Sequence, residues 1–450
     1  MIRNRDQFDV IVAGAGLAGT VAAIASGRSG ASTLLVERSG MLGGVATAGM
    51  MASITNFFYN TAGQKVGSKI ALEIIDRLIA EKVTSPDWES SAVPQIPNQA
   101  DVMQVVLYRM LKEAGVRLLT HTVLLDAIVE GTELKGVTLF NKAGIINLYA
   151  KTVVDCTGDA DVAFYAGAPT TALGRDSSTV LFEMGNVDLH ETYRYYKEHR
   201  EDFDEDMDIA IPFEEFERNW LERGIFHTPH NGGSKNALLQ KAILEGKYAK
   251  EKGMGIGLDA LGLFGTRGTR RVLVNSNYYL VKGVEDAEQL SMAEMEGRER
   301  CLELSKVLVE IMPGFEQAFL TRMASEIGVR LTRFIEGEYL LTEEELLSAK
   351  EFEDAVCFTA SIEKSASGVR VTDRVFGIPY RVLLPKKIEN LIIGSGKSIS
   401  AEDGARAKAL RGQANTMLIG ETAGTAAALA ALSGTPVREL TIQRVREAMS

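Results

Sequence analysis

The chain has 450 residues, of which 46% are hydrophobic, and it carries a formal net charge of -11. Its length is enough to bury a large core. The acidic balance, without basic clusters interleaved with aromatics, argues against nucleic acid as a partner. The three cysteines (Cys156, Cys301 and Cys357) form no CxxC or Cys/His cluster, so we expect no metal site, no disulfide scaffold and a cytoplasmic location. We also expect no secretory signal and no membrane span.

A strand–helix–strand unit opens the chain. The apolar run Asp9–Ala13 predicts a buried strand, the Ala-rich run to about Arg28 predicts a helix, and Thr33–Val36 predicts a second strand. The second strand ends on Glu37, an acid placed to accept hydrogen bonds from an adenosine ribose.

The turn inside this unit reads Gly14-Ala-Gly16-Leu17-Ala18-Gly19, which is the GxGxxG pattern of dinucleotide-binding folds. Gly14 is expected to make the tight turn, Gly16 to let a pyrophosphate touch the backbone, and Gly19 to let the helix pack on the strand. The helix N-terminus, at Leu17 and Ala18, offers N–H groups to the phosphates.

A second loop rich in Gly, Ala and Thr starts at Arg38 and contains Gly43, Gly44, Ala46 and Thr47. A flavin needs close backbone approach along such a loop, whereas a purely NAD-binding domain does not need it. With its LLVER and LGGVATAG sequences, the chain resembles the FAD-dependent oxidoreductases that have a glutathione-reductase-type flavin domain. The resemblance implies a Rossmann-like fold of the α/β class, with FAD as cofactor held by these two loops.

Residues 61–150 continue this domain in the prediction. Helices are expected over 61–82 and 101–114, the latter with Asp101 or Asn98 as N-cap, and strands over 116–119 and 123–130. A hairpin of 134–140 and 145–150 follows. In the family, a backbone amide near Val123 contacts adenine.

A strand at Thr152–Asp155 leads into Thr157-Gly158-Asp159. The resemblance places this turn beside the flavin phosphates or ribitol. The alternative is a structural turn in which Asp159 caps the next segment.

Residues 166–366 are weakly patterned. Their acidic run (201–208 with Glu214, Glu215 and Glu217) is read as a solvated face, and His227 and His230 lack the further ligands that a metal site needs. The resemblance implies an antiparallel sheet with flanking helices that covers the flavin and builds the substrate pocket.

Two later motifs supply candidate catalytic residues. Arg330 and Arg333, in GVRLTRFIEGEY, either hold an anionic substrate group or balance a reduced flavin, or else pair structurally with Glu336 or Glu338. Tyr380 and Arg381, in GIPYRVLLP, are either pocket groups or fold-defining packing residues.

The last part of the chain returns to the flavin. A strand at 390–393 leads to a turn containing Gly396, and a small-residue helix follows Gly412, Ala414 and Asn415. The resemblance points this helix N-terminus at flavin N1 and O2, where negative charge develops on reduction. Relatives carry histidines just before this helix; here only Glu402, Arg406 and Lys408 stand as substitutes for an acid or base.

These observations predict a discontinuous FAD-binding domain of residues 1–165 and 367–450, with an inserted α+β substrate domain of 166–366. The leading hypothesis is an FAD-dependent oxidoreductase that transfers a hydride between a small organic substrate and flavin N5. The partners are then this substrate and an unidentified electron acceptor or donor, with homo-oligomerisation left open. The alternatives are a flavoprotein that uses FAD without net redox (an isomerase or modifying transferase) and a non-catalytic nucleotide-binding protein.

Overall fold

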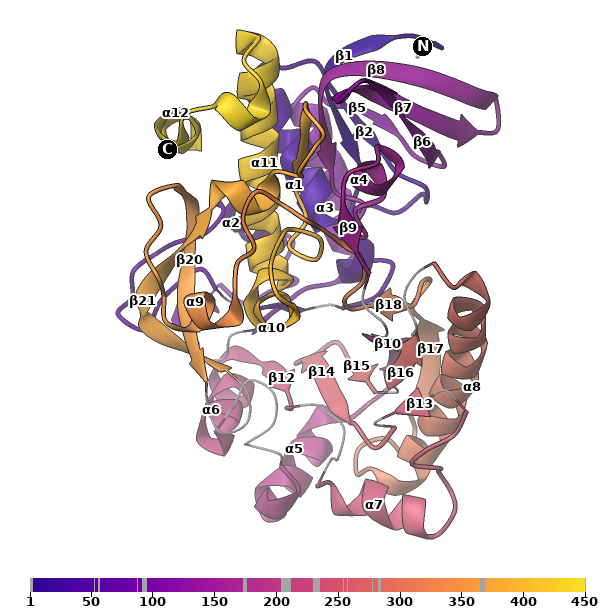
Figure 1. Cartoon of the computed structure of the whole chain (residues 1–450). Helices are drawn as coiled ribbons and strands as arrows, with labels where there is room; N and C mark the ends of the chain where they lie inside the picture. The colour runs from indigo at the N-terminus through magenta and orange to yellow at the C-terminus, as the bar shows by residue number, and fades with distance from the viewer. Residues whose placement is uncertain are drawn as a thin grey trace.

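The computed structural model describes residues 3–51, 53–55, 57–86, 88–90, 95–172, 176–203, 212–229, 235–253, 255–256, 258–276, 278–281, 285–364 and 369–449. Figure 1 shows two lobes, one above the other, and both chain termini belong to the upper lobe. Each lobe has its own hydrophobic core, and we name these the first core and the second core. The first core takes its residues from 8–168 and 335–445, and the second from Met50 and 180–324.

The upper lobe is organised on one mixed sheet. Its strands follow the order β5-β2-β1-β8-β7-β6, with β22 also paired to β8. The bounds are β1 Gln7–Ala13, β2 Thr33–Val36, β5 Arg117–Leu119, β6 Val123–Glu130, β7 Glu133–Asn141, β8 Gly144–Asp155 and β22 Leu391–Ile393. β5, β2, β1, β8 and β22 are parallel, whereas β6, β7 and the first half of β8 pair antiparallel.

Helices α1 and α11 cross at backbone contact in the middle of this lobe, where Figure 1 draws α11 in yellow beside the indigo α1. A Cβ atom added at Gly420 or Gly424 of α11 would overlap the carbonyl oxygen of Ala18 or Ala22 of α1. The two helices can therefore approach closely only because these positions lack side chains. The helices of this lobe are α1 Leu17–Arg28, α2 Lys69–Ala80, α3 Ala100–Glu113, α4 Asp161–Tyr165, α9 Glu343–Leu347, α10 Asp403–Ala405, α11 Gln413–Ser433 and α12 Ile442–Met449.

The lower lobe packs small antiparallel sheets against helices. One sheet has the order β12-β14-β15-β11-β17 and another has the order β13-β16-β10-β18. The strands are β10 Asp176–Thr179, β11 Phe182–Gly185, β12 Ile225–His227, β13 Gly255–Ile256, β14 Gly262–Thr266, β15 Arg271–Asn275, β16 Tyr278–Val281, β17 Phe319–Met323 and β18 Gly328–Val329. The helices are α5 Leu189–Glu198, α6 Phe213–Arg218, α7 Ala237–Leu244 and α8 Ala287–Ile311.

Three two-stranded sheets complete the described structure. They pair β3 with β4, β9 with β19, and β20 with β21. Their bounds are β3 Ser53–Thr55, β4 Gln95–Pro97, β9 Thr170–Thr171, β19 Phe334–Ile335, β20 Ala355–Lys364 and β21 Val369–Pro379. β3 packs on α11 and β4 on β14, so this small sheet lies where the two lobes meet. Among the helices that the structure describes, none combines the length and apolar character needed to cross a bilayer.

The structure confirms the opening strand–helix–strand unit and refines several later elements. The helix predicted over 61–82 begins only at Lys69, because Ser68 caps it by accepting from the Ala71 amide. The second hairpin strand and the predicted strand at 152–155 are one continuous strand, β8.

The domain limits remain a prediction, but burial shifts one of them. Ile335, Leu341, Val356 and Ile362 fall in the predicted insertion of 166–366, yet they belong to the first core. The chain therefore returns to the upper lobe about thirty residues before the predicted limit. His230 and residues 204–208 of the acidic run lie outside the described residues.

Candidate functional site

The Gly14–Gly19 turn connects the end of β1 to α1, and each of its glycines has a distinct environment. Gly14 adopts φ +91, and a Cβ there would lie 2.6 Å from the Cys156 carbonyl oxygen. A Cβ at Gly19 would overlap the Gly14 carbonyl oxygen, whereas one at Gly16 would meet nothing within 4 Å. Gly14 and Gly19 are thus required by the protein's own packing, and Gly16 leaves the space that the sequence predicted for a pyrophosphate.

Glu37 follows β2 at the same carboxyl edge of the sheet. Its two carboxylate oxygens accept hydrogen bonds from the Ala15 and Ser39 amides, each at 2.8 Å. An ionised carboxylate is an acceptor with further lone pairs to offer. A ligand hydroxyl that Glu37 binds must therefore donate a hydrogen bond to the carboxylate, as a ribose hydroxyl does.

The second glycine-rich loop runs directly beside the first turn. Gly43 and Gly44 have φ of +96 and +54, and Gly43 forms a parallel bridge with Gly16. The Gly43 amide donates to the Ala15 carbonyl at 2.8 Å, and the Thr47 hydroxyl donates to the Leu42 carbonyl. Ala46 and Thr47 are buried in the short helical turn that follows. Two glycine-rich stretches of backbone therefore lie in contact, which suits an extended dinucleotide.

The Thr157-Gly158-Asp159 turn carries a cluster of carboxylates. Asp155 is fully buried, and it accepts hydrogen bonds from the Thr157 hydroxyl at 2.7 Å and the Ala163 amide at 3.0 Å. Burial raises the pKa of Asp155. Asp159 accepts from Lys397 at 3.2 Å and from the Thr332 hydroxyl. The residue that caps α4 is Ala160, with no side-chain hydrogen bond, so Asp159 does not serve as the predicted cap.

Asp161 lies in the same cluster and pairs with Arg333 at 2.5 Å. Burial and the neighbouring carboxylates Asp155 and Asp159 raise the pKa of Asp161 to about 6, against the opposing effect of Arg333. Arg333 also donates to the Asp159 carbonyl at 2.9 Å. Arg333 thus has a structural partnership, although with Asp161 rather than with the predicted Glu336 or Glu338.

The other candidate catalytic residues occupy different environments. Arg330 follows β18 and donates to the Ser177 hydroxyl at 3.4 Å. Tyr380 is buried, and its hydroxyl donates to the Val437 carbonyl at 2.8 Å. Arg381 pairs with Asp354 at 2.9 Å near the surface. The geometry of Tyr380 and Arg381 favours the packing interpretation that the sequence left open.

The N-terminus of α11 closes the site from the C-terminal part of the chain. Its N-cap is Gly412, whose position makes no side-chain cap, and Ala414 is buried. The Asn415 side chain is committed to the protein: its Oδ1 accepts from Thr359 at 2.5 Å, and its Nδ2 donates to the Ala409 carbonyl at 3.2 Å. The Gly396 amide donates to the Thr416 hydroxyl at 3.1 Å, which ties the preceding turn to the helix.

The three substitutes for the missing histidines have structural partners. Arg406 is fully buried, donates to the Lys397 carbonyl at 2.7 Å, and its guanidinium lies 3.9 Å from the centre of the Phe334 ring. Lys408 pairs with Glu343 at 2.9 Å, and Glu402 accepts from the Glu343 amide at 2.8 Å. Lys397, which the sequence analysis did not single out, is therefore fixed by Arg406 at its carbonyl and by Asp159 at its ammonium group. Its position as a cation in a glycine-rich turn after a buried strand could have identified it as a candidate site residue.

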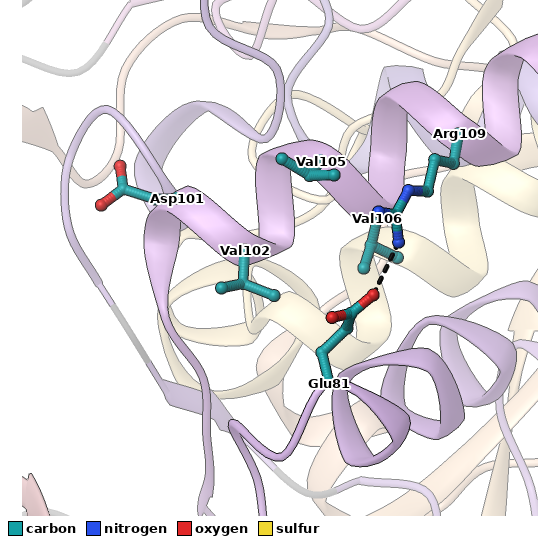
Figure 2. A pocket seen from close by; sticks show the side chains of 6 residues that line it. All are labelled: Glu81, Asp101, Val102, Val105, Val106 and Arg109. Carbon is teal, nitrogen blue, oxygen red and sulfur yellow. Dashed lines mark hydrogen bonds and ion pairs between the residues drawn. The ribbon is translucent and has the colours of Figure 1, made fainter. Parts of the chain in front are cut away.

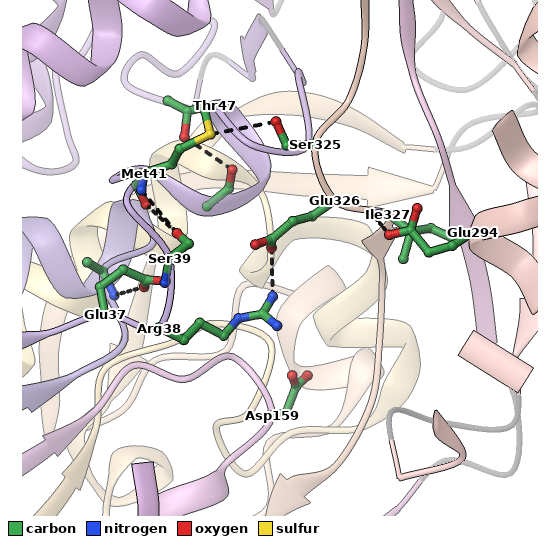
Figure 3. A network of polar contacts seen from close by, with 12 residues as sticks. Glu37, Arg38, Ser39, Met41, Thr47, Asp159, Glu294, Ser325, Glu326 and Ile327 are labelled. Atoms are coloured by element: carbon green, nitrogen blue, oxygen red, sulfur yellow. Dashed lines mark hydrogen bonds and ion pairs between the residues drawn. The ribbon is translucent and has the colours of Figure 1, made fainter. Parts of the chain in front are cut away.

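A short segment of the lower lobe, residues 324–327, joins the second glycine-rich loop (Figure 3). The Ser325 amide donates to the Ala48 carbonyl at 2.8 Å, and Glu326 pairs with Arg38 at 2.6 Å. On the other side, the Ile327 amide donates to Glu294 of α8 at 2.8 Å. The loop predicted to hold the flavin is thus in contact with both lobes.

A separate hollow of about 250 Å³ lies between α3 and the end of α2 (Figure 2). Glu81 and Arg109 pair across it at 2.6 Å. It is lined by Glu81, Asp101, Val102, Val105, Val106 and Arg109, and it contains no residue of the glycine-rich turns.

Val123, the predicted adenine neighbour, is exposed on β6 opposite Phe140. In the described part of the chain, no group of three His, Cys, Asp or Glu residues is arranged to hold a metal ion.

The two adjoining glycine-rich turns lie at the carboxyl edge of the parallel strands, the arrangement that a dinucleotide-binding fold requires. The chain belongs to the FAD dependent oxidoreductase family, whose model matches residues 9–449. It is an FAD-dependent enzyme, and the open face of Gly16, the acceptor at Glu37 and the N-termini of α1 and α11 fit that cofactor.

Comparisons with individual proteins give more distant similarities. A probable electron transfer flavoprotein-quinone oxidoreductase of Escherichia coli is 31% identical over 166 residues, which cover 34% of this chain and 37% of that protein. The match thus spans little more than a third of the length of this relative.

Three solved structures illustrate the similarity in chain path. The p-nitrophenol 4-monooxygenase of Pseudomonas putida has 13% identity and a TM-score of 0.48, covering 99% of this chain and 84% of that chain. A geranylgeranyl bacteriochlorophyll reductase-like protein of Thermoplasma acidophilum has 13% identity and a TM-score of 0.46, with 98% and 83% covered. Glycine oxidase of Geobacillus kaustophilus has 12% identity and a TM-score of 0.42, with 97% and 96% covered.

Proposed function

We propose that this oxidoreductase transfers a hydride between a carbon atom of a small organic substrate and flavin N5. The observation that carries the proposal is the contact of residues 324–327 with the second glycine-rich loop. Because the lower lobe reaches the loop along which the flavin is expected to lie, a substrate bound between the lobes would be shielded from water near the reacting atoms.

The chain's own residues position the cofactor in this proposal. The amides at Gly16–Ala18 and the N-terminus of α1 hold the pyrophosphate, while Glu37 accepts a ribose hydroxyl. The N-terminus of α11 stabilises negative charge on the N1 and O2 side of the ring. The FAD supplies the hydride acceptor or donor at N5.

Arg330 is the candidate for holding an anionic group of the substrate. It follows β18, in which a Cβ atom added at Gly328 would lie 3.9 Å from a methyl carbon of Val45 in the second glycine-rich loop. Arg333 pairs with Asp161 in the carboxylate cluster. An arginine beside the flavin loop is suited to bind a carboxylate in a bidentate manner.

The test uses the protein loaded with FAD under anaerobic conditions. A panel of small hydroxy and amino acids is mixed with it, and we expect at least one to bleach the oxidised flavin absorbance. Arg330→Gln should raise KM for that acid by about tenfold, the loss of roughly one charge-assisted hydrogen bond. Arg381→Gln is the matched control and should leave KM unchanged.

A second arm identifies the class of electron acceptor. The name of the Escherichia coli relative makes a quinone and an electron transfer flavoprotein the first acceptors to add to the reduced protein. Bound FAD that dithionite reduces but no organic substrate bleaches would favour the non-redox alternative. FAD that even dithionite fails to reduce would favour the non-catalytic one.

A further inference from the structure

The Asn98 side chain is a buried amide that makes no hydrogen bond with the described residues. Its side chain is 6% exposed, and among the residues that the structure describes neither its Nδ2 nor its Oδ1 has a hydrogen-bond partner. The sequence suggested that it could cap the following helix, but the N-cap of α3 is Gln99, and no side chain caps that helix. A buried carboxamide with both polar atoms unpaired costs about 1–3 kcal/mol per group, a cost that a ligand able to bond both atoms would remove.

The position of Asn98 puts it at the cofactor edge of the sheet. α3 leads through a short turn into β5, which is parallel to β2, so the N-terminus of α3 lies at the carboxyl edge with the N-terminus of α1. The two helices also end together, since a Cβ at Gly27 of α1 would lie 2.5 Å from the Ala114 carbonyl oxygen after α3. Asn98 thus belongs to the same edge as the Gly14–Gly19 turn.

The small sheet β3–β4 narrows this position to the flavin half of the site. Pro97 pairs with Ser53 of the chain that follows the second glycine-rich loop, and Asn98 is the next residue after Pro97. The carbonyl of Met51 in that chain accepts from Gln413 at the start of α11 at 2.9 Å. We infer that Asn98, the second glycine-rich loop and the N-terminus of α11 lie near one another. Glu37, which is predicted to bind the ribose, belongs to a different part of the site.

The chemistry of the carboxamide restricts what it binds. Asn98 offers two N–H donors and one carbonyl acceptor. A phosphate only accepts, so it would leave Oδ1 unpaired, whereas a hydroxyl or an imide edge both donates and accepts. The flavin half of FAD carries both kinds of group, in its ribityl chain and its ring.

We propose that the Asn98 side chain binds the flavin half of FAD, through a ribityl hydroxyl or the imide edge of the ring. The proposal rests on FAD as the cofactor and does not depend on the direction or nature of the reaction. In this proposal, bound FAD supplies the hydrogen bonds that the Asn98 side chain lacks within the described part of the chain.

The experiment replaces Asn98 by leucine, which has a similar size and no polar atoms, and measures both FAD affinity and apo-protein stability. We expect Asn98→Leu to bind FAD about tenfold more weakly in a flavin fluorescence titration, as the loss of one or two hydrogen bonds requires. The melting temperature of the apo-protein should be unchanged or higher, because an unpaired buried amide has been removed. Affinity for ADP, which lacks the flavin half, should be unchanged.

Tyr279→Phe is the matched control. The Tyr279 hydroxyl is likewise buried and unpartnered among the described residues, but it lies in the second core. This variant should leave FAD affinity unchanged. Asn98→Ala is measured in parallel, so that overpacking by leucine cannot decide the result, and it should weaken FAD binding similarly.

Two results would overturn the proposal. One is unchanged FAD affinity in both folded Asn98 variants; if the apo-protein is also destabilised in both, Asn98 has a partner within the chain. The other is equal weakening of FAD and ADP binding, which would place the contact on the adenylate half.

Discussion

The two cores of this protein differ in the contact at their centre. In the first core, glycine and alanine let backbones touch, as at Gly420 and Gly424 of α11 against α1. In the second core, the rings of Tyr196, Phe203, Phe213, Phe216, Trp220 and Phe226 pack on one another. The first core is thus fixed by the shape of the main chain, and the second by the volume of its side chains.

The largest expected effect breaks the second core. Phe216→Ala removes a buried ring whose centroid lies 4.8 Å from that of Phe203 and 5.1 Å from that of Phe226. We expect it to lower the free energy of unfolding by about 4 kcal/mol in urea denaturation. FAD affinity should stay within about twofold if the cores are energetically separate. Leu244→Ala, at an exposed position, is the control, and a comparable loss there would refute the assignment.

The next effect separates cofactor binding from packing. Gly16 has an ordinary φ of -60 and nothing within 4 Å of its Cβ direction. Gly16→Ala should therefore cost the apo-protein less than about 1 kcal/mol. It should weaken FAD binding about a hundredfold, because the methyl group takes the space of the pyrophosphate. Fluorescence titration and urea denaturation measure the two, and tight FAD binding by this variant would contradict the site.

A smaller effect tests the backbone contact of the first core. In an exposed helix, Gly→Ala stabilises by about 1 kcal/mol. At Gly420 the added methyl would overlap the Ala18 carbonyl, so we expect Gly420→Ala to destabilise the protein by about 2 kcal/mol instead. Leu432→Ala, on the exposed face of the same helix, should change stability by less than about 0.5 kcal/mol. Stabilisation by Gly420→Ala would show that the helices have room.

The smallest effect concerns the carboxylate cluster. The pKa of Asp161 is raised from 3.8 to about 6 in the folded protein. Between these values the folded state holds more protons than the unfolded state, so this group's contribution to stability is present below pH 4 and is lost as the pH rises through about 6. The side chain is 37% exposed, and solvent screening keeps the effect below about 1 kcal/mol.

Asp161→Asn removes this titration. The apo-protein stability of the variant, relative to the unmodified protein, should therefore rise between pH 4 and about pH 7. Urea denaturation at the two pH values gives the difference. The opposite trend would mean that the ion pair with Arg333 outweighs burial.

The contrast between the cores also explains what the sequence could predict. Gly14, Gly16, Gly19 and the strands beside them were predictable, because a dinucleotide and a backbone contact demand particular residues at fixed spacing. β8 was predicted as two strands, since Lys151 interrupts the apolar pattern where the strand exchanges its antiparallel partner for parallel ones. The aromatic cluster left no periodic signal, because packing by volume tolerates many orders of residues.

The site was predicted less completely than the fold. Glycines at fixed spacing are visible in the sequence, whereas ion pairs between distant segments are not. Lys397 meets Asp159, and Arg333 meets Asp161, only after the chain has folded. Asn98 could not be distinguished from a helix cap until the backbone identified Gln99 in that place.

The crossing of α1 with α11 has a consequence for co-translational folding of this protein. α1 spans Leu17–Arg28, but its partner α11 spans Gln413–Ser433 and is therefore synthesised much later. Until then the apolar flank of α1 stays uncovered and the end of β8 lacks its neighbour β22. Apart from Met50, the second core comes from one stretch of the chain, residues 180–324, so it can fold while the nascent chain grows. The predicted flavin pocket cannot form until α11 has been synthesised, and the apolar surface of α1 is a target for chaperones until then.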